Sequence, residues 1–418
     1  NGFQGMVELC HGCAGCRGPQ ETTGGVMCPT FRAAEEEIQA TRGRANMLRQ
    51  AMSGDLDEGE QFTDEFVHEV LDLCVGCKGC TKDCPSEVDM AKMKAEVTHE
   101  YHERNGISLR DYVFANIDTL SKAGSAFAPI SNWATKVPGV RTLMESALGI
   151  AKERDLPTFH RESLEDWFAE RGGARVSRSE ATRSVLLFPD TYTNYNHPEA
   201  GKAAVRALEA ANVHIRIPDD VASSGRPAHS KGMLDNARSA AQQNVERLAP
   251  QIRDGYDVVV VEPSDAVMFQ LDYLDLLSGA DVAEVAANSY GVMEYIDTFR
   301  LDEKLDFRDA DGSLTYHGHC HQKSTKKDHH AVGVLRRAGY AVDPLDSTCC
   351  GMAGSFGYEA EHLSMSKAIA RILYDQVDDS DGDEVVAPGA SCRSQLAEKT
   401  GQTSDPPHPI EKFEAAIR

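Results

Sequence analysis

The cysteines in the first quarter of this chain stand in two runs whose spacing is typical of iron–sulfur ligands. One run, LCVGCKGCTKDCP over 73–85, has C-x2-C-x2-C spacing and a Cys-Pro pair soon after it. The same triplet occurs at 10–16, and a second Cys-Pro pair follows at 28–29. In bacterial two-cluster ferredoxins, the cysteine before proline ligates the other cluster. The doubled motif therefore predicts two [4Fe–4S] clusters with exchanged fourth ligands.

Each predicted ligand set combines one triplet with the Cys-Pro cysteine of the other run. The sets are Cys10, Cys13, Cys16 and Cys84 on one side, and Cys74, Cys77, Cys80 and Cys28 on the other. Structural zinc is the alternative for paired cysteine motifs, but zinc takes four ligands and these runs offer triplets plus Cys-Pro, twice. A disulfide framework is disfavoured because such frameworks belong to small secreted domains.

The remaining cysteines lie in the last hundred residues, each in a loop after a predicted strand. They are Cys320, Cys349, Cys350 and Cys392. In a parallel sheet these loops emerge at one edge, so we expect the thiols to converge. Four thiolates suit either an iron–sulfur cluster or zinc, and a metal-free thiol cluster is the alternative. The two clusters predicted elsewhere in the chain favour iron–sulfur.

Composition limits the possible partners. The chain has 418 residues, and its 66 acidic and 43 basic side chains give a net charge of -23, which disfavours nucleic acid. The acids are scattered, so a halophile's solvated surface is favoured over steering of a basic partner. No apolar run reaches the length of a membrane span. We expect a cytoplasmic protein, with peripheral association at the cytoplasmic membrane face left open, and the start at Asn1 suggests a fragment of a longer polypeptide.

The elements that position the first two cysteine runs are predicted to be helices. Helical patterns cover 33–52, Phe62–Leu73 and about 86–104, and Thr63 is a candidate N-cap of the second. Because a helix follows each run, we predict an all-α two-cluster ferredoxin domain over 1–106.

Residues 107–182 have helical periodicity and no cysteine, and we predict a helical connector there. Both tryptophans of the chain, Trp133 and Trp167, fall in this connector. We expect them to pack against neighbouring elements, since tryptophan is highly buried on average.

From residue 183 onward, predicted strands and helices alternate. The strands are Val185–Phe188, Val213–Ile217, Asp257–Val261, Leu314–His317, Tyr340–Val342 and Glu384–Ala387, and the helices are 198–211, 230–250, 328–338 and 359–377. This alternation implies parallel sheets with right-handed crossovers. The fold class is therefore α+β multidomain, with α/β repeats over 183–305 and 306–418 after the helical part.

The loops of the two repeats correspond in order. Pro189-Asp190-Thr191-Tyr192 matches Gly318-His319-Cys320-His321, Ser223-Ser224-Gly225 matches Cys349-Cys350-Gly351, and Glu262-Pro263-Ser264-Asp265 matches Gly389-Ala390-Ser391-Cys392. This pattern indicates an internal duplication. Only the second copy keeps cysteines, so we expect the first to hold no metal.

These stretches resemble the CCG (cysteine-rich) domains that close the large FAD-linked D-2-hydroxyacid dehydrogenases of D-lactate or D-2-hydroxyglutarate type. The resembling segments are MCPTFRAAEEEIQATRGRANMLRQAMSG, YTNYNHPEAGKAAVRALEAANV, SSGRPAHSKGML, HGHCHQKS, TCCGMAGSFGYE and APGASCRSQ. CCG domains also occur in the iron–sulfur subunit of anaerobic glycerol-3-phosphate dehydrogenase and in heterodisulfide reductase. The resemblance covers nearly the whole chain, and with the acid excess it suggests a haloarchaeal source.

The resemblance implies an oxidoreductase component that transfers electrons. Electrons would come from FAD on a domain or subunit outside this chain, cross two clusters, and leave through the CCG site to a quinone or cytochrome. Disulfide reduction, as in heterodisulfide reductase, is one alternative, and the iron–sulfur subunit of a glycerol-3-phosphate dehydrogenase is a second. A metal-stabilised docking scaffold is an alternative of another class. The chain departs from the fullest CCG pattern by having Gly389 where an extra cysteine would stand and Asp265 at the last position of the first repeat.

Several other side chains accompany the cysteines. His317, His319 and His321 surround Cys320, and imidazoles can ligate metal, relay protons or orient a loop. We also single out five residues that could line a cleft between the repeats, of which the two basic ones could bind an anion: His319, His321, Arg226, Lys231 and Tyr192. Arg42 and Arg44, which follow the first Cys-Pro pair, could offset negative cluster charge.

Overall fold

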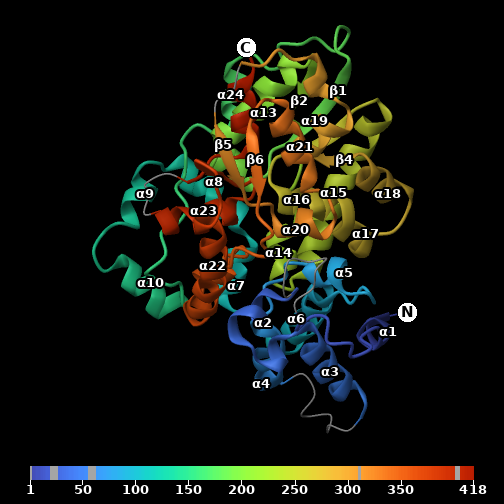
Figure 1. The fold of residues 1–418 in the computed structure, drawn as a ribbon, viewed down its shortest axis with the longest axis vertical. Helices are drawn as coiled ribbons and strands as arrows, with labels where there is room; N and C mark the ends of the chain where they lie inside the picture. Colours follow the sequence, from blue (N-terminus) through green and yellow to red (C-terminus); the bar gives the residue numbers. More distant parts are fainter. Residues whose placement is uncertain (1, 19–26, 55–62, 309–311, 401–404) are drawn as a thin grey trace.

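The computed structural model describes residues 2–18, 27–54, 63–308, 312–400 and 405–418. Its helical N-terminal part lies at one end of the molecule, and two small parallel sheets lie toward the other end (Figure 1). The helices of the first part are α1 (Gly2–Glu8), α2 (Pro29–Ala34), α3 (Thr41–Met52), α4 (Asp64–Val67) with a π-helical continuation over His68–Asp72, α5 (Gly79–Asp83) and α6 (Met90–Asn105).

The helix expected over 33–52 is broken in two. Glu35 adopts a left-handed conformation with φ of 55° and ends α2, and α3 begins only at Thr41. The predicted cap at Thr63 is confirmed, because its side chain accepts a hydrogen bond from the Phe66 N–H at 3.2 Å. Phe62 itself lies outside the described residues. The third helix starts later than predicted, at Met90, since the backbone after the Cys-Pro turn is still non-helical.

The connector contains α7 (Leu109–Ala115), α8 (Ile117–Ala126), α9 (Ile130–Ala134), α10 (Val140–Leu148) and α11 (Leu164–Glu170). Trp167 packs against the hydrophobic core, as expected. The expectation was wrong for Trp133, which is 67% exposed. Its helix α9 contains no buried residue, so no core is available for the indole ring there.

Both sheets are parallel throughout. The first has the order β2-β1-β3-β4 and the second the order β6-β5-β7. Their strands are β1 (Arg183–Phe188), β2 (Val213–Arg216), β3 (Asp257–Val260), β4 (Ser289–Gly291), β5 (Ser313–Tyr316), β6 (Ala341–Pro344) and β7 (Glu384–Val386). The six predicted strands are confirmed, and β2-β1-β3 has the same topology as β6-β5-β7. The strand β4 was missed because three residues carry too little pattern to detect.

Helices connect and cover these strands. They are α12 (Thr191–Tyr195), α13 (Pro198–Ala210), α14 (Arg226–Ser230), α15 (Leu234–Arg253), α16 (Pro263–Val267), α17 (Tyr273–Leu276), α18 (Ala280–Ala287), α19 (Val292–Thr298), α20 (Cys320–Ser324), α21 (His329–Arg337), α22 (Leu363–Asp378), α23 (Ala390–Thr400) and α24 (Pro409–Ala416). The last helix, α24, returns to pack on α13 of the first repeat.

The two repeats share one hydrophobic core. Val185 and Leu187 of β1, Leu314 of β5 and Phe413 of α24 belong to the same buried cluster. Burying one such side chain contributes about 1.5–3 kcal/mol relative to leaving it exposed. The repeats are therefore packed as one unit. The helical N-terminal part contacts this unit through α5 against α20, α6 against α15 and α2 against α22.

Candidate iron–sulfur sites and the C-terminal cysteine centre

The two cysteine triplets fold into the same backbone loop. Gly12 and Ala14 in the first triplet have φ of 71° and 64°, and Gly76 and Lys78 in the second have φ of 60° and 59°. A positive φ is uncommon for residues other than glycine. Alternation of left-handed residues along a loop directs successive N–H groups into one concavity, which suits a negatively charged group. Each triplet is thus shaped to surround something that its thiolates and amides can hold.

Two cavities collect the eight N-terminal cysteines in two sets of four. One cavity is lined by Cys28, Cys74, Cys77 and Cys80. The other is lined by Cys10, Cys13, Cys16 and Cys84. These are the sets expected from exchange of the Cys-Pro cysteines. Four cysteines around a cavity are the donor set that a [4Fe–4S] cluster requires, so the residues present fit that cofactor.

Burial makes free thiolates unfavourable in these cavities. It raises the pKa of Cys16, and it raises the pKa values of Cys77 and Cys80 further because their surroundings exclude water. A thiolate in such a place needs a cationic partner, which the iron of a bound cluster would supply. The burial of the thiols and the set of four cysteines in each cavity are therefore both consistent with a bound cluster.

One arginine lines each cavity. Arg44 is only 1% exposed, and its guanidinium donates to the Val70 carbonyl at 3.0 Å, to Gln39 Oε1 at 2.6 Å and to Thr30 Oγ1 at 3.1 Å, with Cys28 Sγ at 3.6 Å. Arg42 lines the other cavity, and its backbone N–H donates to Cys16 Sγ at 3.4 Å.

The side chain of Arg42 is more exposed than that of Arg44 and pairs with Glu37 at 2.7 Å. The two arginines predicted to offset cluster charge therefore differ in role. Arg44 is a buried structural cation, whereas Arg42 belongs to a surface ion pair.

The four C-terminal cysteines converge at the carboxyl edge of the second sheet. Cys320 begins α20 after β5, Cys349 and Cys350 follow β6, and Cys392 lies on α23 after β7. The Cys349 thiol interacts with those of Cys320 and Cys350, and Cys350 interacts with Cys392. Hydrogen bonding from Cys349 and Cys392 lowers the pKa of Cys350 well below its usual value, although burial opposes this. The centre can therefore hold a thiolate that a metal would bind.

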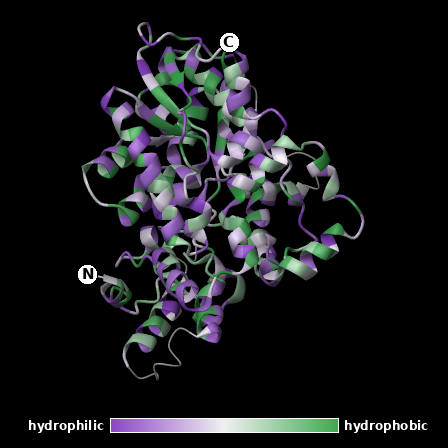
Figure 2. Ribbon diagram, turned by 180° about the vertical axis from the view of Figure 1, so that it is seen from behind, coloured by the Kyte–Doolittle hydropathy of each residue, from purple (hydrophilic) through white to green (hydrophobic). Residues whose placement is uncertain are grey.

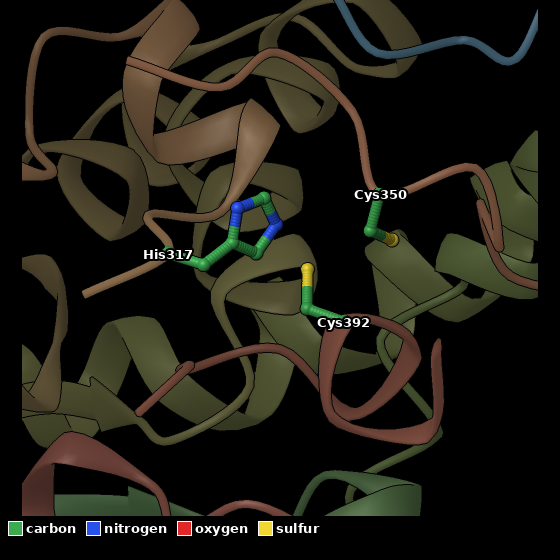
Figure 3. Close-up of side chains that lie close together, drawn as sticks. All are labelled: His317, Cys350 and Cys392. Atoms are coloured by element: carbon green, nitrogen blue, oxygen red, sulfur yellow. The ribbon is translucent and has the colours of Figure 1, made fainter. Parts of the chain in front are cut away.

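His317 completes this C-terminal centre. Figure 3 shows its ring beside Cys350 and Cys392, and the three can offer ligand atoms within 4.8 Å of one another. Its Nδ1 lies 2.6 Å from Ser347 Oγ, and its Nε2 is buried without a hydrogen bond among the described residues. The site residues predicted from the sequence include His319 and His321 but not His317. The signal that could have identified His317 is position, since it directly follows β5 and therefore stands at the carboxyl edge of the sheet.

His319 occupies the space that an extra cysteine would need. A Cβ at Gly389 would lie 2.4 Å from His319 Cδ2 and 3.4 Å from Cys392 Sγ. His319 Nδ1 accepts the backbone N–H of His321 at 3.2 Å, and burial lowers the pKa of His319 to about 4. The absence of a side chain at Gly389 thus leaves room for the neutral imidazole of His319, which packs against the cysteine centre.

His321 joins the C-terminal centre to the ferredoxin-like part. Its Nε2 lies 3.0 Å from the carbonyl oxygen of Gly76, within the second triplet. Burial is the main reason why the pKa of Cys77 is raised, and the charge of Cys320 is the second. Cys77 and Cys320 are therefore close enough for their charges to interact. The cavity lined by Cys28, Cys74, Cys77 and Cys80 is therefore the one beside the C-terminal centre.

A buried ion-pair network holds the same interface. Lys78 Nζ lies 2.7 Å from Asp272 Oδ1, and Arg226 Nη1 lies 2.8 Å from Asp272 Oδ2. Lys231 pairs with Asp111 at 2.9 Å and also with Glu359. Arg226 and Lys231 are thus engaged by carboxylates that tie the parts of the chain together.

Tyr192 lies in the first repeat beside three buried acidic residues, Asp190, Glu262 and Asp265. Burial raises the pKa of Tyr192, and the charges of these three residues raise it further. Burial and Glu262 raise the pKa of Asp190 to about 6. Ser224 Oγ, at a position that corresponds to a cysteine in the second repeat, donates to Asp265 Oδ1 at 2.6 Å. Carboxylates and hydroxyls therefore replace thiols in the first repeat.

Comparisons with known proteins match separate families to the N-terminal cysteine runs and to the C-terminal repeat. The 4Fe-4S dicluster domain family matches residues 6–88, and the Cysteine-rich domain family matches residues 314–397. The chain is 27% identical to one of the subunits of anaerobic glycerol-3-phosphate dehydrogenase from Escherichia coli K12, over 80% of this chain and 83% of that relative.

Two further relatives have the same general character. The chain is 26% identical to D-2-hydroxyglutarate dehydrogenase of Haemophilus influenzae over 94% of this chain, and it spans 42% of that enzyme's length. It is 23% identical to the glycolate oxidase iron-sulfur subunit of Escherichia coli K12, over 93% of this chain and 91% of that relative. The relatives are oxidoreductases or their iron–sulfur components. Within the described ranges, every helix is too short or too polar to cross a bilayer.

Proposed function

We propose that this chain is the iron–sulfur electron-transfer part of an FAD-linked D-2-hydroxyacid dehydrogenase. In this proposal a flavin on another domain or subunit donates the electrons, and a quinone or a cytochrome accepts them. The observation that best supports this proposal is the arrangement of the cysteines. Two cavities lined by four cysteines each lie in one small helical part, and one of these cavities lies beside a third cysteine centre. The similarity to subunits and enzymes named for glycerol-3-phosphate, D-2-hydroxyglutarate and glycolate supports the reaction class.

The proposed ligands are the two crossed cysteine sets, and bound clusters would supply one-electron transfer there. Residues of this chain would fix the positions of the two clusters. The left-handed residues of each triplet shape the binding loops, and Arg44 braces the loop that carries Cys28. His321 and Lys78 hold the second triplet against the C-terminal repeats. Fixed spacing between redox sites is what an electron relay requires of its protein.

For the C-terminal centre we propose an iron–sulfur cluster, with zinc as the alternative. The proposed ligands are Cys320, Cys349, Cys350 and Cys392, and His317 is added as a candidate because its Nε2 faces the same thiols. The convergence of four buried thiols beside a histidine supports a metal in preference to free thiols. We further propose a cytoplasmic protein of a halophile, because the net charge of -23 is spread along the chain.

The test uses the purified chain under anaerobic conditions. We expect a brown protein that dithionite bleaches, and no reduction of a dye by D-2-hydroxyacids, because the flavin belongs to another domain or subunit. Hydroxyacid-dependent dye reduction by this chain alone would refute the proposal that the hydroxyacid is oxidised on another domain or subunit. A protein whose colour does not respond to dithionite would instead favour the docking scaffold.

A further inference from the structure

The helices α8 to α10 turn large apolar side chains outward. Eight of the strongly exposed large apolar residues in the described chain lie between 107 and 143: Ile107, Leu109, Tyr112, Leu120, Phe127, Ile130, Trp133 and Leu143. Neither α9 nor α10 contains a buried residue. These two helices stand at the edge of the molecule on the side away from α1 and α5 (Figure 1), and the reverse view shows them at the same edge (Figure 2).

The arrangement of α8 is the reverse of an ordinary surface helix. Its buried residues are Ser121, Gly124 and Ser125, whereas Leu120 and the residue that follows the helix, Phe127, are 46% and 69% exposed. A surface helix normally places its apolar stripe toward the core. Here the polar and small side faces the protein, so the apolar side points away from the described chain.

Polar contacts hold this lobe in its outward orientation. Asn132 exchanges two hydrogen bonds of 2.8 Å with the backbone of Phe159, and Ser131 Oγ donates to the Gly124 carbonyl at 2.6 Å. The ring of Phe159 packs so closely on Gly124 that a Cβ there would lie 2.6 Å from it. The exposure of Phe127, Ile130 and Trp133 is therefore built into a packed structure.

The lobe is less acidic than the rest of the protein. The stretch 117–148, from the start of α8 to the end of α10, has three basic side chains and two acidic ones, Asp118 and Glu145, in a chain with net charge -23. Lys122 and Lys136 are exposed and make no ion pair within the described ranges. Arg141 is turned inward and donates to two backbone carbonyls at 2.7 Å. Two free lysines thus accompany the exposed apolar side chains.

We propose that this apolar lobe, made of Leu120, Phe127, Ile130, Trp133 and Leu143 with Lys122 and Lys136, is a docking surface for an anionic lipid bilayer. Short amphipathic helices with aromatic residues on one side and lysines beside them lie in the interface of a membrane without crossing it. Tryptophan is enriched at that depth. Free lysines add attraction to anionic headgroups. The local charge complements an anionic surface, whereas the rest of this acidic protein would be repelled by it.

The test is flotation of the whole, cluster-containing protein with vesicles of phosphatidylglycerol and phosphatidylcholine in equal parts, compared with pure phosphatidylcholine. We expect stronger binding to the anionic vesicles. The double variant Phe127→Ser, Trp133→Ser should bind both kinds about tenfold more weakly. The variant Lys122→Glu, Lys136→Glu should lose the preference for anionic vesicles. All four positions are exposed, and the visible absorption of the clusters reports that the variants remain folded.

Leu274, 46% exposed on α17, offers the matched control, because Leu274→Ser removes an exposed leucine far from the lobe in sequence. It should float like the unmodified protein. Equal binding by the lobe variants and the unmodified protein would overturn the proposal. So would a dimer in sedimentation that Phe127→Ser, Trp133→Ser converts to monomers without any vesicle binding, since the lobe would then be an interface between two copies.

Discussion

The Nε2 atom of His321 lies 3.0 Å from the carbonyl oxygen of Gly76, which joins the C-terminal repeat to the loop between Cys74 and Cys77. Because the carbonyl can only accept, this nitrogen must carry the proton. His321 is 7% exposed, so the bond is shielded from water. The two parts of the molecule are therefore linked by a buried hydrogen bond directly at a cluster-binding loop.

Replacing His321 by alanine should lower the free energy of unfolding by about 1–3 kcal/mol, because the Gly76 carbonyl would be left buried without a donor. His321→Gln, whose amide can still donate, should recover part of this loss. Denaturant unfolding of the two variants under anaerobic conditions measures the difference. Equal stability of the alanine and glutamine variants would show that the hydrogen bond contributes nothing beyond packing.

Cys84→Ser should damage the cluster of the Cys10 triplet and spare the one held by its own run. The reason is that Cys84 lines the cavity of Cys10, Cys13 and Cys16. Cys28→Ser should have the reciprocal effect on the Cys74 set. Electron paramagnetic resonance of the reduced variants identifies which signal is lost, and loss of the Cys74 signal in Cys84→Ser would contradict crossed ligation.

Arg44→Met should be far more harmful than Arg42→Met. The Arg44 guanidinium is buried among the Val70 carbonyl, Gln39 and Thr30, which would be left without their donor. We therefore expect a loss of about 1–3 kcal/mol for each buried acceptor, and poor cluster retention. Arg42 forms an exposed pair with Glu37, which is worth about 0–1 kcal/mol. Thermal unfolding and iron content compare the two variants, and similar losses would mean that burial of Arg44 is not the deciding feature.

Stability should fall as the pH rises above about 6.5, through His362. Burial opposes its charged form, but the hydrogen bond to Asp72 and the ion pair with Glu359 outweigh this and raise the pKa of His362. A histidine with a raised folded pKa stabilises the fold below the unfolded pKa of about 6.5, and this contribution disappears as the pH passes the folded value.

The slope from this group is at most about 1.4 kcal/mol per pH unit. The neighbouring charges Lys231 and Arg110 pair with Glu359 and stay protonated over this range. His362→Asn should flatten the pH profile measured by chemical unfolding, whereas His329→Asn at an exposed position should not. An unchanged slope in His362→Asn would place the pH dependence elsewhere.

The C-terminal centre should account for metal beyond that of the two N-terminal clusters. Cys350→Ser should remove this additional iron or zinc and leave the N-terminal signals intact, because Cys350 contacts both Cys349 and Cys392. His317→Ala should weaken retention of the same metal, since its Nε2 faces these thiols. Metal analysis of the whole protein distinguishes the outcomes, and metal content unchanged in Cys350→Ser would mean that no third centre exists.

The sequence by itself determined the local chemistry and the succession of elements. Cysteine spacing within 10–16 and 73–85 pointed to the triplets, because ligands a few residues apart have a geometry that the local loop dictates. The Cys-Pro pairs pointed to the crossed sets, because in this doubled motif the cysteine before proline ligates the other cluster. Alternation of strands and helices predicted six of the seven strands, since burial on a parallel sheet leaves continuous apolar runs.

Only the tertiary structure decided which distant residues meet. The contact of His321 with Gly76, the burial of Arg44 and the pairing of Lys231 with Glu359 join segments that no local pattern relates. The exposure of Trp133 was likewise unpredictable, because an amphipathic pattern shows that a helix has an apolar face but not whether that face turns toward the core. Packing of the connector on the repeats settled that direction.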